Sequence, residues 1–132
     1  MKVLTIKEPW ASLIINEYKT YEFRSWKTKY RGKILIHTSL NAEKDILKRF
    51  TNYNLDIKPG YIIGEAELVD CILVDDEFDN YLVNIDSLIY GNSSHVQKYA
   101  WKLKNIKKYS NPIKIKGKLG LWNYEVENDG DK

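Results

Sequence analysis

Residues 19–26, Lys-Thr-Tyr-Glu-Phe-Arg-Ser-Trp, hold a lysine, a glutamate and an arginine within six positions. Side chains alternate between the two faces of a β-strand. If this run is a strand, one face carries Thr20, Glu22 and Arg24, and its two aromatic side chains face a core. Lys19 stands at the entrance of the strand, where its flexible side chain can reach the same place.

Two interpretations of this charged face are open. A cationic cluster with one anionic member, formed by Lys19, Glu22 and Arg24, suits an anionic or amide-bearing ligand. The same pattern also protects an exposed edge strand, because charged side chains there oppose pairing with another chain.

Composition favours one soluble globular domain. The chain has 132 residues, of which 43% are hydrophobic and 30% charged, enough to build a core. We expect the domain to cover residues 1–127, followed by a frayed polar tail at 128–132. The single cysteine, Cys71, favours a reducing compartment, and there is no apolar run long enough for a membrane span or a signal peptide. These features predict a cytoplasmic protein.

The charged residues alternate with aromatic ones. The net charge is +3, with ten tyrosines and four tryptophans among the lysines and arginines. Such a surface can neutralise phosphates and stack on bases, which favours RNA or a nucleotide as the partner. The alternative is that the aromatic residues form the core, and we expect at least two tryptophans to be structural.

The periodicity along the chain predicts five or six strands with short helices between them. Strands are expected at 2–6, 19–26, 33–38, 61–74 with a bend at Gly64, 99–109 ending before Asn111-Pro112, and 121–126. Helices are expected at 9–18, at 42–50 after an Asn41 cap, and within 75–94. Without regular strand–helix alternation, the order favours an α+β fold, a small, mostly antiparallel β-barrel with short flanking helices.

Three further places hold candidate site residues. Trp10 begins the first helix, where it either reaches a pocket or caps the core. His37 and Ser39 end a strand and place an imidazole and a hydroxyl together, although a lone histidine beside an apolar run is more often a core group. The acidic residues Glu65 and Glu67 lack a histidine or cysteine at ligand spacing, so we predict no metal site and no cofactor.

The chain resembles the ASCH domain family, relatives of the PUA RNA-binding fold. The family motif Gly-x-Lys-x-x-Glu-x-Arg corresponds here to residues 17–24, with Glu17 in place of the glycine. Four further segments match the family: Pro9-Trp10-Ala11, Ile36-His37-Thr38-Ser39, residues 64–70, and Tyr99-Ala100-Trp101. The ordered set covers nearly the whole chain.

The resemblance implies a PUA-like β-barrel with a cleft at one end that binds RNA or a modified nucleoside or nucleotide. In that interpretation Lys19 and Arg24 contact phosphate or a base oxygen. Glu22 either holds Arg24 in place or accepts a base amino hydrogen, and Trp10 or Trp101 stacks on the base. The full candidate ligand set is Trp10, Lys19, Thr20, Glu22, Arg24, His37, Ser39, Tyr99 and Trp101.

Two other functions remain open. One subfamily hydrolyses 4-acetylcytidine with a lysine, a threonine and a glutamate. Lys19 matches that lysine, but Glu22 stands where the threonine would be, with Thr20 on the same expected face. A hydrolase of acylated nucleosides or a ribonuclease would use Lys19 as base and Glu22 as partner, with His37 or Tyr99 assisting on a phosphodiester. The third candidate is a protein-interaction module of the transcription or translation machinery.

Overall fold

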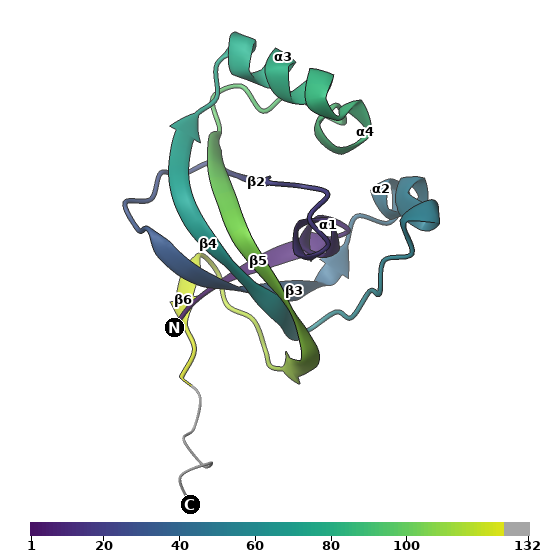
Figure 1. The fold of residues 1–132 in the computed structure, drawn as a ribbon, viewed down its shortest axis with the longest axis vertical. Helices are drawn as coiled ribbons and strands as arrows, with labels where there is room; N and C mark the ends of the chain where they lie inside the picture. Colours follow the sequence, from purple (N-terminus) through teal and green to yellow (C-terminus); the bar gives the residue numbers. More distant parts are fainter. Residues whose placement is uncertain (126–132) are drawn as a thin grey trace, which may run out of the picture.

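The structure is a computed structural model that describes residues 1–125. Six strands form one sheet, and short helices lie between them (Figure 1). The strands are β1 (Lys2–Glu8), β2 (Tyr21–Arg24), β3 (Gly32–Ala42), β4 (Tyr61–Leu73), β5 (Tyr99–Lys114) and β6 (Leu121–Asn123). The helices are α1 (Trp10–Ile15), α2 (Lys44–Leu47), the 3₁₀ helix η1 (Lys48–Tyr53), α3 (Asp76–Ile85) and α4 (Ser87–Tyr90). The predicted α+β class is confirmed.

The sheet is open and mixed, so the predicted barrel is wrong. The strand order is β2-β5-β4-β3-β1-β6, and β2 and β6 are its two edges. All neighbours are antiparallel except β1 and β3, which run parallel. The number and order of strands in the sequence do not show whether the sheet closes or which strand pairs are parallel, because both depend on how the chain crosses between strands. The connection through α1 and β2 returns the chain to the same direction beside β1.

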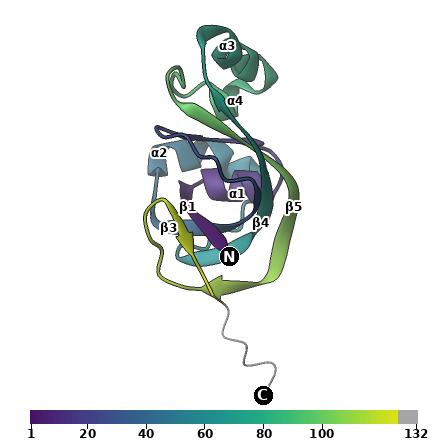
Figure 2. The ribbon, with the colours of Figure 1, turned by 90° about the vertical axis from the view of Figure 1, so that its left-hand side faces the viewer.

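Helix α1 is enclosed by the sheet, which curls around it (Figure 2). Residues Ala11 to Ile15 are all buried, as expected for a helix packed on several sides. The predicted helix at 9–18 is longer than the observed one, which spans Trp10–Ile15. Ser12 lies in that interior, where its hydroxyl and amide both donate to the buried carboxylate of Glu8, at 2.5 and 2.8 Å.

The long β4–β5 hairpin carries α3 and α4 away from the rest of the sheet (Figure 1). These helices begin with side-chain caps, in which Asp75 and Asp86 accept from the amides of Phe78 and Ile89. Their buried residues Leu82, Ile89 and Tyr90 form a second core with Tyr21. The aromatic face of β2 therefore packs under α3 and α4, which places these helices beside the charged face as well.

Gly64 lies at the expected irregularity in β4. A side chain there would meet the backbone oxygen of Lys107 at 2.4 Å and Ile15 Cδ1 at 2.8 Å. Pairing with β5 shifts register between Ile62 and Gly64. The predicted end of this strand before Asn111-Pro112 is wrong, because β5 continues to Lys114. The extra residues of β5 at the register shift between Ile62 and Gly64 accommodate Pro112, which cannot donate a hydrogen bond.

Two further predictions concern a helix cap and the buried tryptophans. Asn41 lies within β3 and Glu43 precedes α2, so the predicted Asn41 cap is wrong. Trp101 and Trp122 are buried, which confirms the expectation of two structural tryptophans. The end of the predicted last strand and the predicted tail at 128–132 lie outside the described residues.

Candidate functional site

The turn between α1 and β2 brings Lys19 into the protein interior. The amide of Glu17 donates to Ile14 O, and the amides of Tyr18 and Lys19 donate to Leu13 O. This Schellman-type pattern needs a left-handed residue just after the helix. Glu17 fills that place with φ of +66°, so the turn keeps a conformation that glycine adopts more easily. The chain then reverses and delivers the Lys19 side chain under the sheet, where it is 3% exposed.

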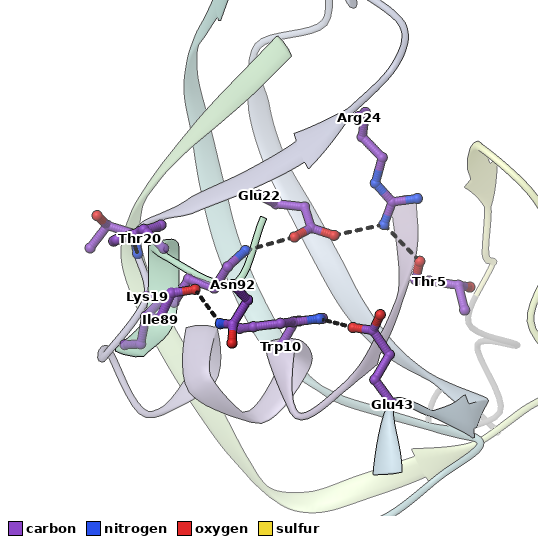
Figure 3. Close-up of polar contacts among 10 residues, drawn as sticks. Thr5, Trp10, Lys19, Thr20, Glu22, Arg24, Glu43, Ile89 and Asn92 are labelled. Carbon is purple, nitrogen blue, oxygen red and sulfur yellow. Dashed lines mark hydrogen bonds and ion pairs between the residues drawn. The ribbon is translucent and has the colours of Figure 1, made fainter. Parts of the chain in front are cut away.

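Three charged side chains from this segment form one connected group (Figure 3). Lys19 Nζ donates to Glu22 Oε1 at 2.8 Å, and Arg24 Nη2 donates to Glu22 Oε2 at 3.0 Å. Arg24 Nη2 also donates to the backbone oxygen of Thr5 at 2.9 Å, which ties β2 to β1. Glu22 is 7% exposed, so this is a buried ion group and not a surface pair.

Burial and neighbouring charge act on both partners of the Lys19–Glu22 pair. Burial lowers the pKa of Lys19, and the nearby Glu22 carboxylate opposes this only in part. Burial also disfavours the Glu22 carboxylate, but Lys19 and Arg24 together outweigh it, and the pKa of Glu22 is lowered. Glu22 is therefore ionised at neutral pH, and Lys19 is easier to deprotonate than an exposed lysine.

Lys19 and Glu22 lie in the wall of a cavity of about 330 Å³. Its other walls come from α1, β2, α2 and the residue before it, α4, and the segment after α4. They are Trp10, Phe23, Glu43, Ile46, Ile89, Asn92, Ser93, His95 and Lys98. Lys19 Nζ lies 5.5 Å from the ring centre of Trp10 and 5.1 Å from that of Phe23, so the ammonium is bordered by aromatic faces.

Trp10 is held in its place by Glu43. The indole Nε1 donates to the Glu43 carboxylate, and the ring packs edge-on against Phe50 (Figure 3). Of the two roles expected for Trp10, the structure supports the pocket, although the ring also covers part of the core. One face of the cavity is therefore an aromatic wall with a fixed orientation.

The structure brings only some of the predicted site residues to this cavity. Trp10, Lys19 and Glu22 line it, whereas Arg24 lies behind Glu22 and does not. Thr20 is exposed and meets the hydroxyl of Tyr90 through its backbone amide. Its side chain is not part of the wall.

The remaining predicted residues lie elsewhere. Trp101 is 0% exposed in the core, so its ring cannot stack on a base, and Tyr99 pairs with Arg24 across the sheet. His37 and Ser39 line a separate cleft of about 670 Å³. His37 is a satisfied core histidine: Nε2 donates to Ile115 O at 2.7 Å and Nδ1 meets Thr5 Oγ1 at 3.1 Å. The structure therefore does not bring these four residues to the cavity of Lys19, and their role in binding a ligand stays a prediction.

The sequence did not predict most of the cavity wall: of its lining residues, only Trp10, Lys19 and Glu22 were candidate site residues. Glu43 lies outside every motif and directly precedes α2. The other polar residues of the wall lie about 70 residues from the motif, and they are Asn92, Ser93, His95 and Lys98. Their only signal is a run of polar residues, 91–95, between a helix and a strand. That run predicts a connection but does not indicate which part of the molecule it faces.

Residues 1–125 contain neither a cluster of metal ligands nor a membrane-spanning helix. There is no group of three or more histidine, cysteine, aspartate or glutamate residues that could hold a metal ion. There is also no helix of sufficient length and apolar character to cross a membrane.

Comparison with known proteins gives matches of three kinds. A family model described as "ASCH domain" matches residues 4–114. Activating signal cointegrator 1 of Homo sapiens is 28% identical to the chain over 81 residues, and that of Mus musculus is 30% identical over 81 residues. Each alignment covers 52% of this chain and 14% of the relative, so the chain spans a small part of these proteins.

Solved structures match in fold. The crystal structure of ASCH from Zymomonas mobilis has a TM-score of 0.51 and 19% sequence identity, covering 86% of this chain and 72% of that one. A mutant of the same protein gives the same TM-score and identity, with 74% of its chain covered. At this identity the similarity is one of fold.

Proposed function

The chain belongs to the ASCH domain family, and from the geometry of its cavity we propose that it binds a base or nucleotide of RNA through Lys19 and Trp10. The single observation that carries the proposal is a buried lysine that points into a cavity with an aromatic wall. Glu22 takes one N–H of Lys19. Within residues 1–125 the other two have no acceptor, so they are free for a ligand oxygen.

The cavity supports a ligand of nucleoside size. Its volume of about 330 Å³ falls within the usual range for small-molecule sites. Trp10 offers a ring face to a planar base, and such stacking contributes roughly 1–3 kcal/mol per base. Lys98, which is exposed at the rim, is in position for a phosphate next to the bound nucleoside.

In this proposal Glu22 and Arg24 prepare the site. Arg24 holds the Glu22 carboxylate, and the carboxylate holds the Lys19 ammonium at 2.8 Å. Because the group is already ordered before binding, the ligand does not have to order the lysine side chain. Arg24 therefore acts as a positioning residue and not as a direct contact.

The test compares Lys19→Met with Lys29→Met, an exposed lysine away from the cavity. Binding of a fluorescein-labelled single-stranded RNA and of mononucleotides is measured by anisotropy and calorimetry. We expect Lys19→Met to weaken binding at least tenfold, about 1.4 kcal/mol, with its circular dichroism unchanged, and Lys29→Met to bind like the wild type. Equal affinities for all three proteins, or no binding by the wild type, would refute the proposal.

Hydrolysis is a second candidate, and the lowered pKa of Lys19 is the observation that favours it. A lysine of lowered pKa is neutral in a larger fraction of molecules and can act as a base. Glu22 does not replace the missing threonine as nucleophile, since both of its oxygens are held by cations. Incubation with 4-acetylcytidine and with single-stranded RNA, wild type beside Lys19→Met, decides: turnover by the wild type alone supports an enzyme, and no turnover leaves the binding proposal.

A further inference from the structure

His95 lines the same cavity from the segment between α4 and β5. Its ring stacks on Phe23, with 3.8 Å between ring centres and 20° between planes. On its other side, Nδ1 lies 3.3 Å from Asp79 Oδ1, and the His95 backbone amide donates to the same oxygen at 3.1 Å. Stacking and two contacts to one carboxylate hold this imidazole in a fixed orientation.

The contact with Asp79 decides which nitrogen carries the proton. An ionised carboxylate only accepts hydrogen bonds, so Nδ1 must be the N–H donor. In a neutral imidazole the other nitrogen, Nε2, then has a free lone pair. No residue in the range 1–125 donates to Nε2, so this lone pair is available to a molecule in the cavity.

The surroundings favour the neutral ring. Burial lowers the pKa of His95, and the positive charges of Lys19 and Lys98 lower it further. Asp79 acts in the opposite direction through its hydrogen bond and its charge, but the sum remains lowered. The charged groups that shift the pKa of His95 thus come from three places: Lys19 from the turn before β2, Asp79 from α3, and Lys98 from the segment before β5.

We infer that His95 is a specificity residue that accepts a hydrogen bond from an N–H group of the bound ligand, while Lys19 donates to a carbonyl oxygen of the same ligand. This inference rests on the proposed function, because it assigns the substrate class of that cavity. A donor from Lys19 and an acceptor from His95 together match a planar ring that carries both C=O and N–H. Uracil and guanine have such a lactam group, and methylation of the ring nitrogen removes its N–H.

The experiment measures nucleoside affinity and the tautomer of His95. Binding of uridine and 3-methyluridine, and of guanosine and 1-methylguanosine, is compared by calorimetry or NMR titration for the wild type, His95→Phe, Asp79→Asn and Lys19→Met. We expect the wild type to prefer each unmethylated nucleoside at least tenfold. His95→Phe keeps an aromatic ring against Phe23 and removes the acceptor, so the preference should fall to about onefold.

Asp79→Asn gives an independent readout. Both His95 contacts are to Asp79 Oδ1, and an asparagine oxygen can accept from both donors, so this variant should keep the Nε2 lone pair and the preference for N–H nucleosides while removing the charge. Nitrogen-15 chemical shifts of His95 in the ligand-free wild type report the tautomer directly, with no substitution that could unfold the protein. A protonated Nε2 at pH 7 would overturn the inference.

The outcomes separate the two proposals. If the wild type binds no nucleoside or RNA, both fail. If the wild type binds and Lys19→Met does not, while His95→Phe discriminates like the wild type, the binding function stands and the role of His95 is refuted.

Discussion

Replacing Glu22 by glutamine tests whether the buried ion group behaves as its geometry indicates. The substitution keeps the size of the side chain and removes its charge. Lys19 is 3% exposed and loses the carboxylate that lies 2.8 Å from its ammonium. Arg24 loses its ion pair with Glu22 and keeps its hydrogen bond to the backbone oxygen of Thr5. We expect Glu22→Gln to lower the free energy of unfolding far more than a surface substitution does.

Two routes give the magnitude. Removing one partner of a buried ion pair destabilises proteins by about 3–5 kcal/mol. Lys19 can avoid this penalty by losing its proton, which sets an upper bound. Between the ordinary lysine pKa of about 10.4 and pH 7 there are about 3.4 units, each about 1.36 kcal/mol, so deprotonation costs at most about 4.6 kcal/mol. The first estimate, limited by the second, predicts a loss of about 3–4.6 kcal/mol at pH 7.

The variant should also show a characteristic pH dependence. Once Lys19 is neutral in the folded variant and protonated in the unfolded chain, the unfolded state binds one more proton. The free energy of unfolding then increases with pH, by up to about 1.4 kcal/mol per unit, from the folded pKa up to the unfolded value near 10.4. The burial that already lowers the pKa of Lys19 in the wild type acts in the same direction, so the slope should be steeper in the variant.

The assay is urea unfolding at pH 6, 7, 8 and 9, followed by tryptophan fluorescence and circular dichroism. Glu17→Gln, at an exposed position, is the matched control and should change stability by less than about 0.5 kcal/mol. The double variant Lys19→Met with Glu22→Gln should recover about 1–3 kcal/mol relative to Glu22→Gln, because no charge remains unpaired. A loss below about 1 kcal/mol with no added pH slope would refute the reasoning.

Three further predictions concern the fold around the site. Glu17→Gly should raise the free energy of unfolding by about 0.5–1 kcal/mol in urea, because the +66° φ of Glu17 suits glycine better than glutamate; a loss of stability would contradict the assigned turn. Ser12→Ala should destabilise by about 1.5–3 kcal/mol at pH 7 and by less at pH 4, because its hydroxyl donates to buried Glu8, whose pKa burial raises, so that a larger fraction of this carboxyl group is ionised at pH 7 than at pH 4; equal losses at both pH values would be inconsistent with this. Burial and the hydrogen bond to Glu65 raise the pKa of Tyr109 to about 12, so stability should fall as pH rises from about 10 to about 12, and carbon-13 NMR of Tyr109 should show a lower pKa in Glu65→Gln; an unchanged titration would exclude the role of Glu65.

The charged face of β2 illustrates how far local spacing reaches. The two-residue repeat correctly placed Glu22 and Arg24 together, and the two carboxylate contacts confirm the pairing. The alternative of a charged, solvent-exposed edge strand does not describe β2, which is an edge strand in pairing but has Glu22 buried by α1 and by the segment after α4. Alternation fixes which side chains share a face and carries no information on what covers that face.

His37 and Trp101 mark the opposite outcome. Both belong to segments that match the family, yet His37 serves the packing of β3 against residues 115–117, and Trp101 fills the core. A motif match places a residue in the correct strand. Whether its side chain points into the cavity depends on strand register, which shifts within both β3 and β4.

The sequence by itself determined the family, the α+β class, and the segment that carries Lys19, Glu22 and Arg24, because each motif depends on local residue spacing and the order of motifs and elements can be seen along the chain. Only the tertiary structure decided that the sheet stays open, that Lys19 is buried, and that Glu43, His95 and Lys98 complete its cavity. Burial, ion pairing and the resulting pKa changes depend on side chains brought together from positions up to about 80 residues apart, and no local pattern specifies which of those distant segments will pack there.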